Sequence, residues 1–139
     1  TIWELKTDTA NQQSIITTQE FRYQNSTNSS QFNQPKVYLI NDNSITSITS
    51  EQGKSQDDTI FEFNKNVNIT QQNLINKEKV NLKTEYLTYN ITSETVSTDD
   101  KIQINFPQGK ITGSGFHGNL ATRDFTVKSN VKTELNPQQ

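Results

Sequence analysis

The sequence predicts an all-β fold in which two sheets face each other, and three observations support this class. Apolar and polar residues alternate with a period of two along the whole chain, as they do in half-buried strands. Short segments rich in Asn, Ser, Asp, Gly and Pro interrupt the alternation, as turns do. No stretch longer than two helical turns has the apolar spacing of a helix, so strands must supply the whole apolar interior.

The alternating segments define the expected strands in chain order. Their apolar positions are Trp3 and Leu5; Val37 and Leu39; Phe61 and Phe63; Val67 and Ile69; Val80 and Leu82; Leu87, Tyr89 and Ile91; Ile102, Ile104 and Phe106; Phe125 and Val127; and Val131 and Leu135. Loops are expected at residues 25–31, 41–44, 51–58, 97–100 and 107–110, which have turn compositions. Residues 7–14 are expected to form a loop or a short helical turn.

One hairpin pattern occurs twice. The segment 61–67 matches 125–131 at a constant offset of 64, and Ile48-Thr49 matches Ile111-Thr112 at an offset of 63. Such a repeat indicates stacked hairpins, each covering the apolar face of its neighbour. Two copies fall short of a solenoid, and the general similarity of alternating strands is the alternative explanation.

The composition is compatible with one folded domain over residues 1–139. Only 29% of residues are hydrophobic and the mean hydropathy is -0.85, values that favour disorder. The net charge of -2 and the 9% of aromatic residues argue against disorder, and the polarity comes from Asn, Gln, Ser and Thr. Since every second residue of a half-buried strand is polar, a low apolar fraction suits an all-β domain.

Charge and cysteine content exclude several functions. The near-neutral balance creates no field that would attract nucleic acid or an anionic membrane surface. The absence of cysteine excludes disulfides and thiol catalysis. No apolar run approaches the roughly 20 residues of a membrane span. Because the chain opens at Thr1 on a strand-like segment, a membrane anchor is expected upstream of it.

Candidate catalytic residues are few, and no enzyme activity, cofactor or metal is predicted. His117 is the single histidine, and neither a nucleophilic triad nor a histidine-rich metal site can form without partners. The acidic pairs 57–58 and 99–100 suit a glycosidase or a calcium site, but Asp among turn-forming residues more often bonds to its own backbone.

The order of several motifs resembles the periplasmic domain of the LptC family, which belongs to the lipopolysaccharide export bridge of Gram-negative bacteria. The resemblance extends over essentially the whole chain, although the bridge proteins LptA and LptD share some of the patterns. The matching motifs are Trp3-Glu4-Leu5, Phe32-Asn33-Gln34-Pro35-Lys36-Val37, Ile48-Thr49-Ser50-Glu51-Gln52-Gly53, Phe63 to Val67, Leu82-Lys83-Thr84-Glu85-Tyr86-Leu87, Val96-Ser97-Thr98-Asp99, Gly113-Ser114-Gly115-Phe116 and Gly118-Asn119-Leu120.

The resemblance implies a fold, a ligand and two partners. The fold is an antiparallel, elongated and twisted open jelly roll that holds the acyl chains of lipopolysaccharide between its sheets. The inner-membrane LptBFG transporter would meet the N-terminal edge and LptA the C-terminal edge, in a periplasmic domain tethered to the inner membrane. The edge residues are Ile2, Trp3 and Leu5 at one end and Lys128, Val131, Lys132 and Leu135 at the other.

The inner faces of the predicted strands supply the candidate lipid-binding residues. A one-residue error in register would move a whole strand's set to the other face. The candidates are Phe32, Leu39, Ile48, Phe61, Phe63, Val67, Leu82, Leu87, Tyr89, Ile104, Phe106, Phe116, Phe125, Val127, Val131 and Leu135.

Three alternatives remain at the level of the sequence. The first is an LptA-like bridge protein. The second is a carbohydrate-binding or adhesion sandwich, which would expose Trp3, Tyr86 and Tyr89 on a flat platform. The third is a glycosidase, in which Asp58 would converge with Asp99 or Asp100. The sequence also leaves open whether the isolated domain forms a homodimer through its free edges.

Overall fold

The protein consists of β-strands joined by short turns. The computed structural model describes residues 3–9, 12–18, 20–24, 29–56, 59–122 and 124–136. No helix occurs in these ranges, and therefore none that is long and apolar enough to cross a membrane. The strands are β1 (Trp3–Thr9), β2 (Gln12–Thr18), β3 (Glu20–Gln24), β4 (Ser29–Asn33), β5 (Lys36–Asn41), β6 (Ser44–Thr49), β7 (Gln52–Gln56), β8 (Ile60–Asn73), β9 (Lys79–Asn90), β10 (Thr95–Phe106), β11 (Gly109–Asn119) and β12 (Phe125–Leu135).

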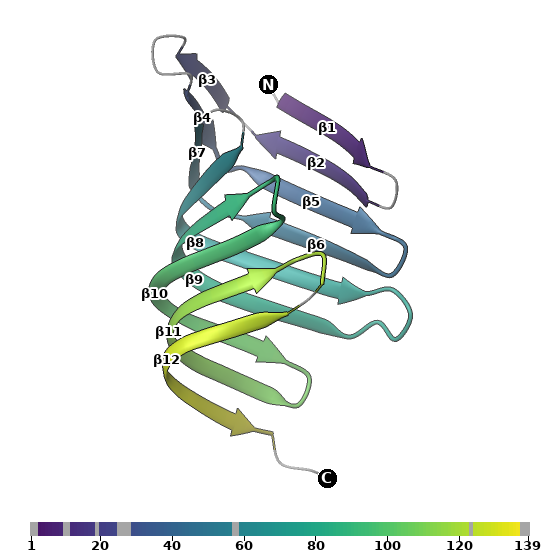
Figure 1. The fold of residues 1–139 in the computed structure, drawn as a ribbon, viewed down its shortest axis with the longest axis vertical. Helices are drawn as coiled ribbons and strands as arrows, with labels where there is room; N and C mark the ends of the chain where they lie inside the picture. The colour runs from purple at the N-terminus through teal and green to yellow at the C-terminus, as the bar shows by residue number, and fades with distance from the viewer. Residues whose placement is uncertain are drawn as a thin grey trace.

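All these strands belong to one antiparallel sheet. Its main path is β1-β2-β5-β6-β8-β9-β10-β11-β12, and a branch β3-β4-β7 joins it at β8. The strands stack along the long axis of the molecule, so that β1 and β12 lie at opposite ends (Figure 1). The predicted class, an elongated, antiparallel and open β-fold, is confirmed.

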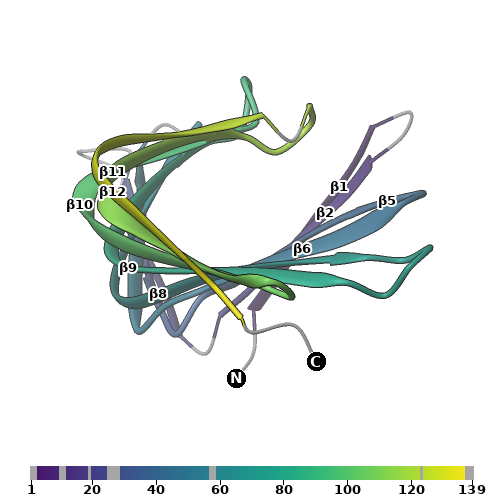
Figure 2. The same ribbon diagram turned by 90° about the horizontal axis from the view of Figure 1, so that it is seen from below.

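The sheet is bent into two layers. The first half of β8 pairs with β7 and its second half pairs with β6, so one strand runs through both layers. The strands β9 to β12 cross between the layers in the same way. Viewed along the stack, the layers form two arms that meet at the bend and diverge on the opposite side (Figure 2). We call the layer that contains β3, β4 and β7 layer A, and the layer that contains β1, β2, β5 and β6 layer B.

Irregular backbone positions produce the bend. Lys65 and Asn66 of β8 have φ values of 67° and 51°, and the register with β9 shifts between Asn64 and Val67. Asn tolerates this left-handed conformation better than most residues, and a bulge of this kind bends a strand. We call this row of positions the bend line; its members are Gln34, Glu51, Lys65, Asn66, Glu85, Asp99, Asp100, Gly115 and Asn130.

Hydrogen bonds join neighbouring strands along the bend line, where the regular ladder is interrupted. The Gln34 amide donates to the Glu51 carbonyl, and the Glu51 amide donates to the Lys65 carbonyl, each at 2.9 Å. The Asn66 amide donates to Oε2 of Glu85 at 3.1 Å. These bonds satisfy backbone groups that the bulges would otherwise leave unpaired.

The repeated sequence corresponds to repeated geometry. Ile48 pairs with Ile69 and Gly53 with Phe63 in the first copy. In the second copy, Ile111 pairs with Thr133 and Phe116 with Val127, at the same offsets of 63 and 64. Asn130, which matches Asn66, has a φ of 54° and marks the bend of β12.

Several expected loops are strands or bends instead. Residues 52–56 form β7, and Asp57 and Asp58 lie outside the described residues. Residues 97–100 lie inside β10, where Asp99 and Asp100 occupy the bend line. The strand β4 begins at Ser29, within the expected loop 25–31. Residues 7–14 belong to β1 and β2 wherever they are described. Bends within strands and turns between strands use the same polar residues, because both need residues that tolerate a positive φ. The sequence pattern therefore predicted loops where the structure has strands with a bend.

Candidate functional site

Cross-strand neighbours form rows along the stacking axis of the sheet. One row in layer B is almost entirely aliphatic, and we call it the aliphatic row. From β5 to β12 it contains no charged residue, so it gives the interior an apolar floor along this axis. Its members there are Val37, Ile48, Ile69, Leu82, Ile104, Ile111 and Thr133, and by register the row continues to positions Ile16 of β2 and Leu5 of β1.

Layer A faces this row with aromatic side chains. The ring of Phe61 lies 5.7 Å from that of Phe32 and 6.5 Å from those of Phe63 and Tyr89. Near the bend line the interior is closely packed, because Ile48, Phe63, Val67 and Leu87 are at most 1% exposed. This part of the interior is a core.

A cavity remains between the layers, away from the bend line. Its volume is about 130 Å³. Its apolar lining comes from Ile69, Val80, Leu82 and Ile104 of layer B and from Val96, Phe116, Leu120 and Phe125 on the side of layer A, and the polar residues Thr46, Gln71, Asn119 and Asp124 also line it. The rings of Phe116 and Phe125 lie 5.9 Å apart at its β12 end. The interior therefore changes from a packed core at the bend to an apolar cavity at the open side.

The inner face of β12 is largely uncovered. Phe125, Val131 and Leu135 are 55%, 56% and 71% exposed. The matching residues of β8, Phe61 and Val67, are 4% and 0% exposed. The two strands share sequence and register, but β8 lies between β7 or β6 and β9 whereas β12 pairs with β11 alone. Large apolar residues exposed together on one face of an edge strand indicate a site of interaction.

The predicted interior residues fall into three groups in the structure. Leu39, Ile48, Phe61, Phe63, Val67, Leu82, Leu87, Tyr89, Ile104 and Phe116 are buried. Phe32, Phe106 and Val127 are half-buried, and Phe125, Val131 and Leu135 are exposed. These last three have the predicted inward parity, and they are exposed because, in the described part of the chain, β12 pairs with β11 alone. Of the predicted edge residues, Trp3 and Leu5 lie in β1, Ile2 lies outside the described residues, and Lys128, Val131, Lys132 and Leu135 lie in β12.

Among the buried hydrophobic residues of the core, the candidate list from the sequence omitted four: Val37, Ile69, Val96 and Ile102. Three of them could have been predicted. Val37, Ile69 and Ile102 each lie two residues from a predicted interior residue, namely Leu39, Val67 and Ile104, and residues two apart in a strand face the same side. Val96 pairs with Tyr89 and packs in the core. It gave no signal, because the alternation around it consists of Ser and Thr.

The candidate catalytic groups do not converge. His117 is exposed on the outer face of β11, and Asp99 forms a salt bridge with Lys128 at 2.9 Å. Among the described residues, no three His, Cys, Asp or Glu side chains gather in a way that would hold a metal ion. Tyr89 is only 2% exposed, which contradicts the carbohydrate platform expected for an adhesion domain.

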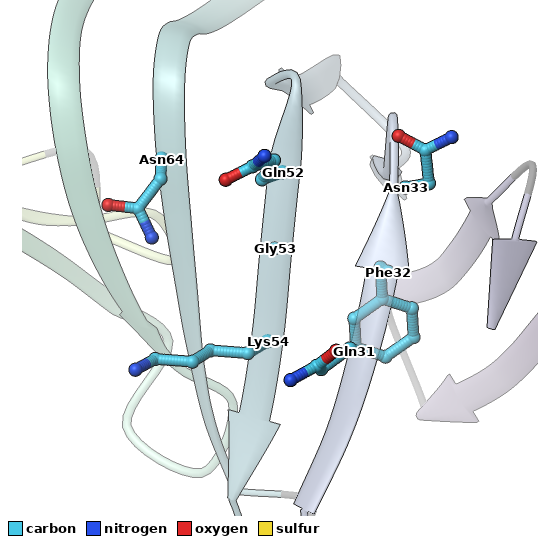
Figure 3. A pocket seen from close by; sticks show the side chains of 7 residues that line it. All are labelled: Gln31, Phe32, Asn33, Gln52, Gly53, Lys54 and Asn64. Carbon is cyan, nitrogen blue, oxygen red and sulfur yellow. The ribbon is translucent and has the colours of Figure 1, made fainter. Parts of the chain in front are cut away.

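The outer face of layer A carries a polar depression of about 330 Å³. Figure 3 shows its lining on β4, β7 and β8, where amide side chains and Lys54 surround the backbone of Gly53. Lys54 forms a salt bridge with Glu62 at 3.1 Å, and Tyr86 Oη donates to Glu62 Oε1 at 2.6 Å. The Tyr86 hydrogen bond and the Lys54 charge lower the pKa of Glu62. This is a solvated, hydrogen-bonded outer face.

The buried Tyr89 predicts a loss of stability at alkaline pH. Burial, with a smaller effect of the Glu94 charge, raises the pKa of Tyr89 to about 12. A raised pKa in the folded state favours the neutral phenol, so its stability contribution is complete below pH ~10 and is lost as pH rises toward ~12. The two-unit shift corresponds to about 3 kcal/mol.

The measurement is the free energy of unfolding in urea at a series of pH values from 8 upward. Tyr89→Phe is expected to flatten the decline above pH ~10 relative to the parent chain, because the mutant has no phenol to ionise at this position. Tyr86→Phe is the matched control and should flatten it less, since Tyr86 is only half-buried. Equal slopes in the parent and Tyr89→Phe would contradict the burial of this hydroxyl.

Comparison with known proteins identifies the family. The family model described as lipopolysaccharide-assembly, LptC-related matches residues 5–136. The chain belongs to this LptC-related family. The family is one of lipopolysaccharide assembly and is not defined by a catalysed reaction. A search of curated proteins found no match in sequence.

The fold of this LptC-related chain is similar to that of a solved bridge protein. LptH of Pseudomonas aeruginosa is described as the LptA homologous periplasmic component of the conserved lipopolysaccharide transport device. It aligns with a TM-score of 0.70 over 89% of this chain and 95% of its own length. The sequence identity is 9%, so the likeness is one of fold.

Proposed function

We propose that this LptC-related protein carries lipopolysaccharide in the periplasm, with the acyl chains between its two layers. The observation that carries the proposal is the apolar interior that runs from β5 to β12 and is uncovered along β12. Membership of a lipopolysaccharide-assembly family supports the same ligand. In this role the protein receives the lipid from LptBFG at the end that holds β1 and delivers it to LptA at β12, while tethered to the inner membrane.

The energetics favour an apolar row over a single deep pocket. Removing each acyl methylene from water contributes about 0.8 kcal/mol, so a chain of about twelve carbons contributes roughly 10 kcal/mol. Because the aliphatic row repeats Leu, Ile and Val from strand to strand, neighbouring positions along it have nearly equal energies for a methylene. The lipid then advances along the row without crossing a high barrier.

The position of the cavity indicates where lipid enters. The cavity lies between the two layers at the side where the arms diverge. We expect the arms to move apart at this side when lipid enters, while the packed core at the bend line holds the layers together. The acyl chain contacts residues of the open side, such as Val80, Leu120 and Phe125.

Lipopolysaccharide retention by two neighbouring variants tests the proposal. Phe125→Asp places a charge in the cavity wall and is expected to reduce co-purified lipopolysaccharide at least tenfold, because a carboxylate among acyl chains is strongly unfavourable. Thr126→Asp adds the same charge one residue away, on the opposite face of β12 and exposed, and should retain the lipid. Equal retention by both folded variants would refute binding at this site.

A further inference from the structure

Two polar residues lie on the inner face of layer B, at positions where the alternation would place apolar side chains. Thr46 of β6 is two residues from the buried Ile48, and Gln71 of β8 is two residues from the buried Ile69, so each faces inward like its neighbour. Thr46 and Gln71 are cross-strand partners, and Gln71 Nε2 donates to Thr46 Oγ1 at 3.0 Å. We call these two residues the inner polar pair.

The inner polar pair faces the cavity between the layers. Both residues line it, beside the apolar Val80, which pairs with Gln71 on β9. Thr46 is 2% exposed and Gln71 is half-buried. Because Gln71 is two residues farther from the bend line than Ile69, the pair lies toward the side where the arms diverge (Figure 2). An acyl chain that enters from this side meets the pair near its head, with its tail directed toward the packed core.

The inner polar pair has hydrogen-bonding capacity that the protein does not use. A threonine hydroxyl donates one hydrogen bond, and the side-chain oxygen of glutamine is an acceptor. In the described part of the chain, Gln71 Nε2 is the only hydrogen-bond partner of the Thr46 hydroxyl, and Gln71 Oε1 accepts no hydrogen bond. Thr46 therefore offers a donor, and Gln71 offers an acceptor, to a molecule that occupies the cavity.

The other polar residues that line the cavity lie on the side of layer A, at the end of β11 and in the turn that follows it. Asn119 Oδ1 already accepts hydrogen bonds from the backbone amides of Ala121 and Thr122, at 2.9 and 3.0 Å. Asp124 is exposed. The remaining lining is apolar, so the inner polar pair lies among apolar side chains, where an unpaired polar group is especially costly.

A hydroxyl group on the acyl chain matches the inner polar pair. A hydroxyl both donates and accepts, so it can donate to Gln71 Oε1 and accept from the Thr46 hydroxyl. Because Oε1 and Nε2 belong to one amide group, Oε1 lies at most about 5 Å from Thr46 Oγ1, and one oxygen between these two atoms can bond both. A plain methylene chain at the same place expels water and leaves both groups unpaired, which is unfavourable in an apolar site.

We infer that the inner polar pair selects acyl chains that carry a hydroxyl group near the head end over plain acyl chains of the same length. The inference deepens the proposed function and rests on it, since it needs an acyl chain in the cavity. Thr46 and Gln71 determine specificity, whereas the apolar lining supplies most of the affinity. The hydrogen bonds of one matched hydroxyl are expected to raise the affinity about tenfold.

Calorimetric titration with two fatty acids, 3-hydroxymyristate and myristate, tests this selection. The parent chain is expected to bind 3-hydroxymyristate about tenfold more tightly than myristate. Gln71→Leu replaces the amide with an apolar side chain and is expected to bind the two fatty acids with nearly equal affinity. Gln72→Leu is the matched control and should keep the parent's preference, because Gln72 is the next residue of β8 and faces the outer side.

Thr46→Val keeps the shape of the side chain and removes the hydroxyl. It is expected to reduce the preference, and its combination with Gln71→Leu is expected to abolish it; urea denaturation checks that each variant is folded. Equal affinity for the two fatty acids in the parent, or a preference that persists in the folded double variant, would overturn the inference and leave the proposed function standing. Binding of neither fatty acid by the parent would contradict both.

Discussion

Replacing Phe63 with Ala is expected to lower the free energy of unfolding by about 3–5 kcal/mol. Phe63 is 1% exposed and lies beside Gly53 on β7 and Leu87 on β9, in the part of the interior nearest the bend line. Truncation removes the ring from a site where both layers are closely packed and leaves a cavity that the sheet cannot close. Urea denaturation followed by circular dichroism measures the change.

Phe125→Ala is the matched control for this substitution. Phe125 is 55% exposed on the inner face of β12, so its truncation is expected to cost less than about 1 kcal/mol. The contrast separates the packed core from the uncovered end of the interior. Similar small effects at both positions would mean that the interior near the bend line is not packed, and the account of a core that holds two movable arms would then be wrong.

Deleting Lys128–Gln139 is expected to abolish binding of LptA while the rest of the domain stays folded. This deletion removes the second half of β12, where nearly every residue is exposed, so little buried apolar surface is lost. It also removes the edge and the exposed Val131 and Leu135, on which the proposed delivery to LptA depends. The measurement is co-purification with LptA, together with a urea denaturation curve of the truncated chain.

A chain that ends at Asn136 is the control for this deletion, because it keeps the whole of β12. It should bind LptA as the full chain does. LptA binding that survives deletion of 128–139, in a protein with a cooperative unfolding transition, would show that LptA uses another surface.

Much of the fold was predictable because side-chain alternation is a local property. Phe61 and Phe63 are two residues apart, as are Ile102 and Ile104, so each pair faces the same side of its strand. The structure places all four residues in the core. The Asn66 and Asn130 correspondence was also visible as a repeat, although its role as a bend was not. Asp99-Asp100 and segment 51–58 look like hairpin loops in sequence, because bends inside long strands need the same polar residues as loops.

The division of the interior into a packed and an open part was not predictable. Leu87 and Phe125 are equally apolar and occupy inward positions, yet one is fully buried and the other mostly exposed. The difference depends on which strands flank each position and how far it lies from the bend line, and both are properties of the whole sheet. For the same reason, no local pattern in the sequence predicted the position of the cavity beside Phe116 and Val80.

Photo-crosslinking along β12 in cells tests the central claim most directly. A photoreactive residue at Phe125, Val127 or Val131 on the inner face is expected to form adducts with lipopolysaccharide, and the same residue at Thr126 or Lys132 on the outer face is not. Alternating adducts of this kind would place the acyl chains between the two layers. Equal labelling of both faces, or labelling of the outer face alone, would contradict the account.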